Sequence, residues 1–165
     1  MAKQLAPQWI NPDTAPGTGQ IAKGRWAIGE ARRRLSNHDD IALETTLSGK
    51  WTFALVQSAL SAGYSLEMHF IALSSAALGA ERIKSRVEQG GHDVPLEEQQ
   101  RRFPRAFYNA AELAKSCDLI ALYDNSGDFR EGHEHRMIAK RTRGRRAYYA
   151  PACPPWARLI LTGKL

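Results

Sequence analysis

Apolar side chains recur every three or four positions in three stretches of the chain, the spacing of an amphipathic helix. The stretches are residues 20–37, 51–62 and 76–87. The second stops at Gly63 and the third before Gly90-Gly91, and glycine commonly follows the last turn of a helix. We therefore predict three helices here. A fourth begins near Pro95 and places Phe103 and Phe107 on one face, and Pro104 should kink it or divide it in two because proline lacks a backbone donor.

Three short apolar runs between these helices predict strands over residues 41–46, 66–73 and 118–123. Strands that alternate with helices form a parallel sheet with helices on both faces, so the predicted class is α/β. Proline and glycine gather in residues 7–19, 90–95 and 151–155, which we interpret as loops inside a single domain over residues 1–165.

Composition narrows the class of protein. The chain has 165 residues, 43% of them hydrophobic and 24% charged, which suits a globular protein with a core rather than a disordered one. No apolar run approaches the roughly 20 residues of a membrane span, and Met1–Ile10 has no secretory signal, so we expect a cytoplasmic protein that does not enter a membrane. Two cysteines are too few for a disulfide scaffold.

The net charge of +6 is concentrated near the carboxyl end. Residues 130–146 hold seven Lys and Arg against Glu131 and Glu134, and residues 136–150 alternate loosely about Gly144, which predicts a short basic β-hairpin. Such a hairpin is either a solvated charged surface or a ribbon that contacts an anion, including nucleic acid.

Ligands of parallel α/β sheets bind beyond the carboxyl ends of the strands. Asp13 and Glu44 should project into one crevice there, where two acids suit proton transfer or Mg²⁺. The alternatives are a turn-capping role for Asp13 and a buried, backbone-bonded acid for Glu44. Arg82 and Arg86 share a helical face, and with the arginines around Pro104 they suit a lid over phosphates or, alternatively, a solvated face.

Motifs for phosphate and metal binding are absent from the 165 residues. No G-x-x-x-x-G-K-[ST] occurs, and neither Gly17-Thr-Gly19 nor Gly49-Lys50 has the spacing of a phosphate loop. His133-Glu-His135 lacks the spacing of a zinc site, so no metal-ligating residue is predicted.

Several segments in their order along the chain resemble the zeta toxin-like family of P-loop kinases, in its chromosomal branch of predicted ATPases. The segments are Ile10-Asn-Pro-Asp13, Ala42-Leu-Glu-Thr-Thr-Leu-Ser-Gly49, Arg82 to Arg86 with Gln89-Gly-Gly-His-Asp-Val-Pro95, Arg101-Arg-Phe-Pro-Arg105 with Asn109, and Tyr123-Asp-Asn-Ser126. The resemblance spans roughly residues 8 to 130 and leaves the basic hairpin uncovered.

The resemblance implies an ATP- and Mg²⁺-dependent kinase that phosphorylates a sugar hydroxyl of a UDP-N-acetylglucosamine-like nucleotide, with an antitoxin protein as a further partner. It makes Asp13 the general base and Arg86 a catalytic, phosphate-neutralising residue. It assigns Glu44, Thr45 and Thr46 to the substrate pocket and Arg102, Arg105, His92 and Asn125 to ATP or phosphate binding.

The family also begins with a central strand and a phosphate-binding loop that this sequence does not contain. We therefore predict a P-loop-like sheet without its first, central strand, and a chain that is by itself a weak or inactive kinase. The alternatives are a folded remnant without activity and a non-catalytic protein that binds nucleic acid through the basic hairpin.

Overall fold

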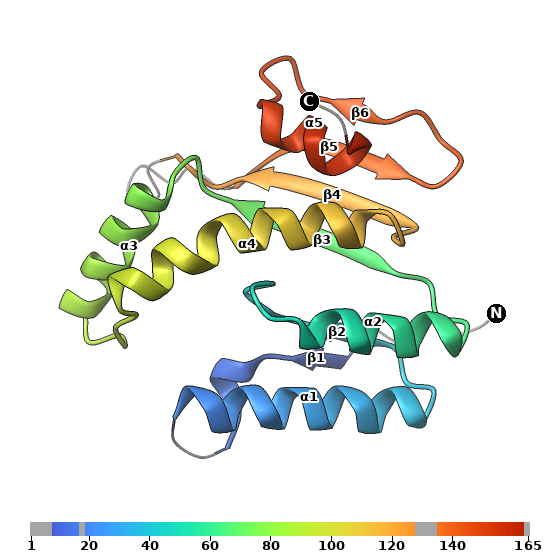
Figure 1. The fold of residues 1–165 in the computed structure, drawn as a ribbon, viewed down its shortest axis with the longest axis horizontal. Helices are drawn as coiled ribbons and strands as arrows, with labels where there is room; N and C mark the ends of the chain where they lie inside the picture. The colour runs from blue at the N-terminus through green and yellow to red at the C-terminus, as the bar shows by residue number, and fades with distance from the viewer. Residues whose placement is uncertain (1–7, 17–18, 128–134, 164–165) are drawn as a thin grey trace. The chain divides into compact units, whose positions relative to one another are not determined.

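The computed structural model describes residues 8–16, 19–127 and 135–163, which fall into two compact units, Met1–Tyr64 and Ser65–Leu165 (Figure 1). The α/β class is confirmed, while the expectation of a single domain stays a prediction. No helix in the described part of the chain is long and apolar enough to cross a bilayer.

The first unit contains a two-stranded parallel sheet and two helices. Its elements are β1 (Gln8–Ile10), the 3-10 helix η1 (Pro12–Thr14), α1 (Gln20–Ser36), β2 (Ile41–Leu43) and α2 (Trp51–Ser61). The buried side chains of Ile10, Ala27, Ala31, Leu35 and Leu55 form one core cluster. The helical periodicity therefore predicts both helices correctly, because the apolar stripe of each packs against the sheet.

Strand β1 lies in residues that we expected to be a loop. It pairs with β2 in parallel, with Gln8 opposite Ile41 and Ile10 opposite Leu43. A strand of three residues between prolines carries too short a pattern to be recognised, and its conformation comes from the pairing with β2. Strand β2 is also shorter than expected, since it ends at Leu43, and Leu47 in the segment that follows takes a positive φ of 55°.

The second unit contains a four-stranded mixed sheet with three helices of its own. Its elements are β3 (Glu67–Ala72), α3 (Ala76–Glu88), α4 (Leu96–Ala114), β4 (Leu119–Asp124), β5 (Arg136–Thr142), β6 (Tyr148–Tyr149) and α5 (Pro155–Thr162). The strand order is β3-β4-β5-β6, with β3 and β4 parallel and the later pairs antiparallel. The basic hairpin is thus part of the sheet, and its turn contains Gly144 at a φ of 75°.

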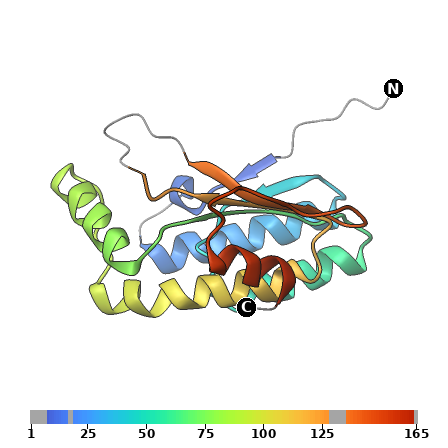
Figure 2. The same cartoon turned by 90° about the horizontal axis from the view of Figure 1, so that it is seen from above.

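Aromatic side chains fill the space between this sheet and helices α4 and α5, which lie on the same side of it (Figure 2). The Phe70 ring meets Phe107 and Trp156 edge-on, with centroids 5.3 and 6.2 Å apart. On the other face, Ile71 is 53% exposed and Met137 39% exposed. We predicted helices on both faces of the sheet. Among the described residues of this unit, helices cover one face.

The structure of α4 differs from the prediction, and α5 is a helix that the sequence did not predict. Pro104 lies inside an unbroken helix over Leu96–Ala114, so the predicted division into two pieces is wrong. Pro104 is exposed, and a carbonyl freed on the solvent side of a helix can bond to water instead. Helix α5 begins at Pro155, within a segment expected to be a loop, because proline suits the first helical position and Ile160 and Leu161 are buried beyond it.

Arg141 joins the carboxyl ends of two helices. Its guanidinium donates one hydrogen bond to the Leu161 carbonyl oxygen of α5, at 2.8 Å, and another to the Ala114 carbonyl oxygen of α4. The last carbonyl groups of a helix lack partners within the helix and carry partial negative charge. Arg141 therefore satisfies two such groups and fixes β5 against both helices.

Replacing Arg141 with Met should reduce the free energy of unfolding by about 2 kcal/mol, because two partly buried carbonyl groups lose a charged donor. Urea denaturation followed by circular dichroism measures this loss. The matched control is R146M, an exposed arginine of the same hairpin, for which we expect a change within about 0.5 kcal/mol. Equal stability of the two variants would contradict the assigned role.

Candidate functional site

The carboxyl ends of β1 and β2 form the edge from which the first group of candidate residues emerges. Both strands run in the same direction and in register, so the segments 11–14 and 44–48 leave the sheet side by side. The Glu44 N–H extends this pairing by donating to the Ile10 carbonyl oxygen at 3.0 Å. The structure therefore brings Asp13 and Glu44 to the same strand edge, where both side chains are exposed.

Asp13 lies in η1, a single turn with a well-defined start. The Asn11 side-chain oxygen accepts the Asp13 N–H at 2.8 Å, and the Thr14 hydroxyl donates to the Asn11 carbonyl oxygen at 2.9 Å. The backbone N–H of Asp13 is thus capped by a neighbour, while its own carboxylate accepts no hydrogen bond from the described residues. The geometry makes Asn11 the turn cap and leaves the Asp13 carboxylate available to an outside hydroxyl.

The segment that follows β2 holds Glu44, Thr45 and Thr46 in a compact turn. The Thr45 hydroxyl oxygen accepts the Leu47 N–H at 3.1 Å, and the Thr46 and Ser48 hydroxyl oxygens lie 3.0 Å apart. The Glu44 side chain is exposed and has no bonded partner in the described part of the chain, so the buried, backbone-bonded alternative does not apply. The Thr45 hydroxyl hydrogen remains free to donate.

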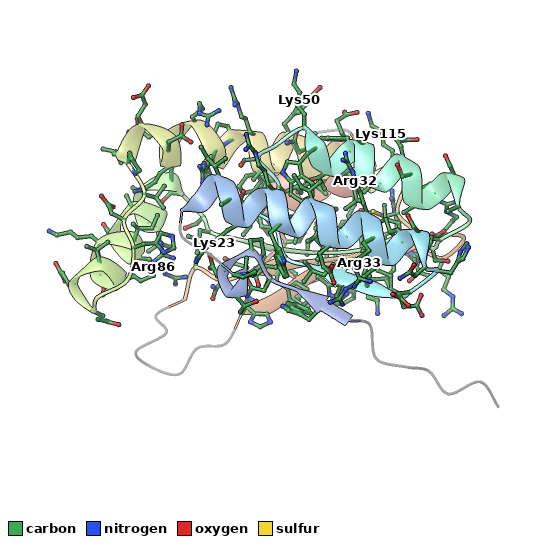
Figure 3. All side chains as sticks on the ribbon, turned by 90° about the horizontal axis from the view of Figure 1, so that it is seen from below. Lys23, Arg32, Arg33, Lys50, Arg86 and Lys115 are labelled. Atoms are coloured by element: carbon green, nitrogen blue, oxygen red, sulfur yellow. The ribbon has the colours of Figure 1, made fainter. Side chains whose placement is uncertain are left out.

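Lys23 is a residue that the sequence interpretation missed. From the first turns of α1 its ammonium group donates to the Asp13 backbone carbonyl oxygen at 3.3 Å. Figure 3 labels Lys23 on this helix. A lysine ten positions after Asp13 carries no motif, so only the fold of the intervening chain reveals the contact.

In the second unit, the carboxyl ends of β3 and β4 are joined by hydrogen bonds. The Asn125 N–H donates to the Ala72 carbonyl oxygen at 2.8 Å, and the Ser74 N–H donates to the Ser126 hydroxyl at 2.7 Å. Arg82 reaches the same loop and donates to the Gly127 carbonyl oxygen at 2.7 Å. Asn125 therefore lies at the carboxyl end of β4, as the sequence predicts. Arg82 holds the loop that follows this strand.

Arg86 and His92 are in contact through the loop that follows α3. The Arg86 guanidinium donates to the His92 carbonyl oxygen at 3.4 Å, and the Gly91 N–H donates to the Arg86 carbonyl oxygen at 2.9 Å. Both side chains are exposed, and Figure 3 labels Arg86 on α3. The His92 contact uses its backbone, so its imidazole is not part of this arrangement.

Arg102 and Arg105 lie on α4 in different environments. The Arg102 guanidinium is paired with the Glu98 carboxylate at 2.9 Å, and Arg101 is paired with the same carboxylate. Hydrogen bonds from Arg101, and then from Arg102, lower the pKa of Glu98. Arg105 is exposed and has no bonded partner in the region the structure describes. A phosphate ligand would thus compete with Glu98 for Arg102 and would find Arg105 free.

The donor groups on these elements do not by themselves form a metal site. Among the described residues, no group of three or more His, Cys, Asp or Glu side chains could hold an ion. Of the His133-Glu134-His135 motif, only His135 lies inside the described residues, and its ring packs edge-on against Tyr123. Gly17 and Thr18 of the Gly17-Thr-Gly19 segment also lie outside the described residues.

The loop that follows α3 leaves no room for a side chain at Gly91. A Cβ added there would lie 2.6 Å from the Arg86 Cγ atom and 3.0 Å from the Arg86 carbonyl oxygen. Gly91→Ala should break the Gly91-to-Arg86 hydrogen bond and lower the free energy of unfolding by about 1 kcal/mol. Amide hydrogen exchange at residue 91 measures the loss of this bond.

The control is Gly79→Ala in α3, the helix that precedes this loop, where the added Cβ meets Leu73 at an ordinary 3.6 Å. Alanine is the better helix former, so this variant should be more stable by up to about 1 kcal/mol. Undiminished protection of the residue 91 amide in Gly91→Ala would show that the loop adapts without cost.

Comparison with known proteins covers most of this chain. The family model described as zeta toxin matches residues 11–134, which include all nine candidate site residues. An uncharacterized protein of Haemophilus influenzae is 32% identical over 85 residues, which are 52% of this chain and 60% of that relative. No solved structure matches the chain significantly. Because the matched region exceeds half of the sequence, the chain belongs to the zeta toxin family.

Proposed function

We propose that this chain takes part in ATP-dependent phosphorylation of a sugar hydroxyl on a UDP-N-acetylglucosamine-like nucleotide, the reaction that its family resemblance implies. The observation that carries the proposal is the position of Asp13. Its carboxylate is exposed and has no partner in the described residues, it lies at the same strand edge as Glu44, and it falls within the family match.

The proposed role of Asp13 is to accept the proton of the attacking hydroxyl. A general base must have a free oxygen within hydrogen-bonding reach of that proton. The Asn11 and Lys23 contacts to the Asp13 backbone support this role, because they hold the main chain and leave the carboxylate unoccupied. Such positioning lowers the entropy lost when the substrate binds.

Glu44, Thr45 and Thr46 are proposed to bind the sugar. An exposed carboxylate accepts hydrogen bonds from sugar hydroxyls, and threonine hydroxyls both donate and accept them. Arg86 is proposed to neutralise the charge on the transferred phosphoryl group, with Arg102, Arg105, His92 and Asn125 assigned to ATP or phosphate. Since the sequence lacks a G-x-x-x-x-G-K-[ST] run, we expect little turnover from the 165 residues alone.

Substrate binding tests the sugar-binding half of the proposal. Calorimetric titration of the chain with UDP-N-acetylglucosamine should give saturable binding, weakened about tenfold in Glu44→Gln through the loss of charge-assisted hydrogen bonds. The control is Asp40→Asn, an exposed acid at the opposite end of β2, which should leave the affinity unchanged. Absence of binding, or an equal effect of both variants, would contradict the assignment of Glu44.

Phosphoryl transfer tests the role of Asp13. We expect barely detectable transfer from ATP by the 165 residues, and higher rates after fusion to a strand and phosphate loop of a family member. In that fusion Asp13→Asn should lower kcat by about 10² to 10⁴ while substrate affinity stays the same, because a general base acts in the transition state. Robust turnover by the unfused chain would refute the predicted weakness, and an active Asp13→Asn fusion would refute the base.

A further inference from the structure

A pocket of about 280 Å³ lies in the second unit, between the end of α4 and the turn that joins β5 to β6. In Figure 1 this turn and the end of α4 lie at the same end of the sheet, and the Arg143 N–H donates to the Asp118 carbonyl oxygen at 2.7 Å. Seven residues line the pocket: Lys115, Cys117, Arg141, Thr142, Arg143, Gly144 and Arg145. Four of these carry a positive charge and none is acidic.

The pocket is distinct from the candidate kinase residues of this unit. Lys115 and Cys117 precede β4, whereas Asn125 and the loop held by Arg82 follow it. The six residues of β4 separate the two places by about 20 Å at the rise of an extended strand. A ligand in this pocket therefore does not occupy the strand edge where the family resemblance locates the chemistry.

The charges around the pocket are only partly balanced. Lys115 pairs with Glu112 at 2.7 Å, and Arg143 pairs with Asp118 at 3.1 Å. Arg141 instead donates to two backbone carbonyl oxygens. The Arg145 N–H donates to the Thr142 carbonyl oxygen at 3.0 Å, but the Arg145 guanidinium has no bonded partner in the described part of the chain. The partial negative charge of these two helix ends offsets part of the Arg141 charge, whereas the Arg145 charge faces no carboxylate among the described residues. An anion bound in the pocket would balance the positive charge that remains.

The remaining lining groups do not oppose an anion. Burial raises the pKa of the Cys117 thiol to about 11, so this thiol is protonated and neutral at physiological pH. The Thr142 side chain adds a hydroxyl, and Gly144 adds no side chain. Arg141 and Arg143 are already fixed by their bonds to the protein, which reduces the side-chain entropy that a ligand must restrict.

We propose that this pocket binds the phosphate group of a small phosphorylated molecule. A phosphate has the charge and the oxygen geometry that arginine side chains recognise by paired hydrogen bonds. A nucleic-acid strand is less well suited, because it needs a track of exposed cations. In this tract Arg141 and Arg143 are held by partners inside the protein, and the Arg145 guanidinium is the lining cation that has no partner among the described residues.

The test is a titration of the ¹⁵N-labelled 165-residue chain with pyrophosphate, monitored by the amide resonances of the lining residues. We expect saturable shifts centred on Cys117 and residues 142–145. In Arg145→Gln the affinity should fall about tenfold, the usual effect of losing one charge-assisted hydrogen bond. The matched control is Arg146→Gln, the neighbouring exposed arginine that does not line the pocket, for which the affinity should be unchanged.

A second titration uses a single-stranded oligonucleotide at about 50 and 200 mM salt. The proposal predicts weak binding there, with pyrophosphate still confined to the pocket. It is overturned if pyrophosphate shifts no pocket resonance, if Arg145→Gln and Arg146→Gln weaken it equally, or if only the oligonucleotide binds, with equal losses in both variants. No phosphoryl transfer is measured, so the result is independent of the proposed kinase function.

Discussion

The hydrogen bond from the Glu44 N–H to the Ile10 carbonyl oxygen sets the geometry of the candidate site. It continues the register of β1 and β2 one step beyond the strands, so that both chains leave the sheet at one edge. A slip of one residue would turn Ile10 out of the core in which it is fully buried. The burial of the Ile10 side chain thus fixes where the segments that carry Asp13 and Glu44 leave the sheet.

Sequence pattern predicted the elements that carry a recognisable arrangement of apolar residues. Helices α1, α2 and α3 and strands β3 and β4 lie close to their expected bounds, because apolar residues recur at helical spacing in the helices and gather in short runs in the strands. Strand β1 and the full length of α4 could not be predicted in this way. The first depends on a partner more than thirty residues away, and the second on the solvent exposure of Pro104, which local propensity does not report.

The candidate site was predictable in part. Glu44 follows a strand, and the rule that ligands bind beyond the carboxyl ends of strands indicates that edge. The Lys23 contact was not predictable, since it depends on the fold of the intervening chain. The pairing of Arg102 with Glu98 is different, because it joins residues four positions apart on one helix, a spacing that a sequence can indicate. The basic tract shows the same limit as the Lys23 contact. Its composition predicts a charged surface, yet Arg141 bonds to two helix ends, while the Arg145 guanidinium has no partner in the part of the chain that the structure describes.

Strand β3 lies at the end of its sheet and pairs with β4 alone among the described strands. The backbone groups along its other side are therefore not used in that ladder, over a length of six residues. Such a border is able to accept one more strand without any change in the order of β4, β5 and β6. A further strand could therefore pair with this side of β3 by docking, without refolding of this unit.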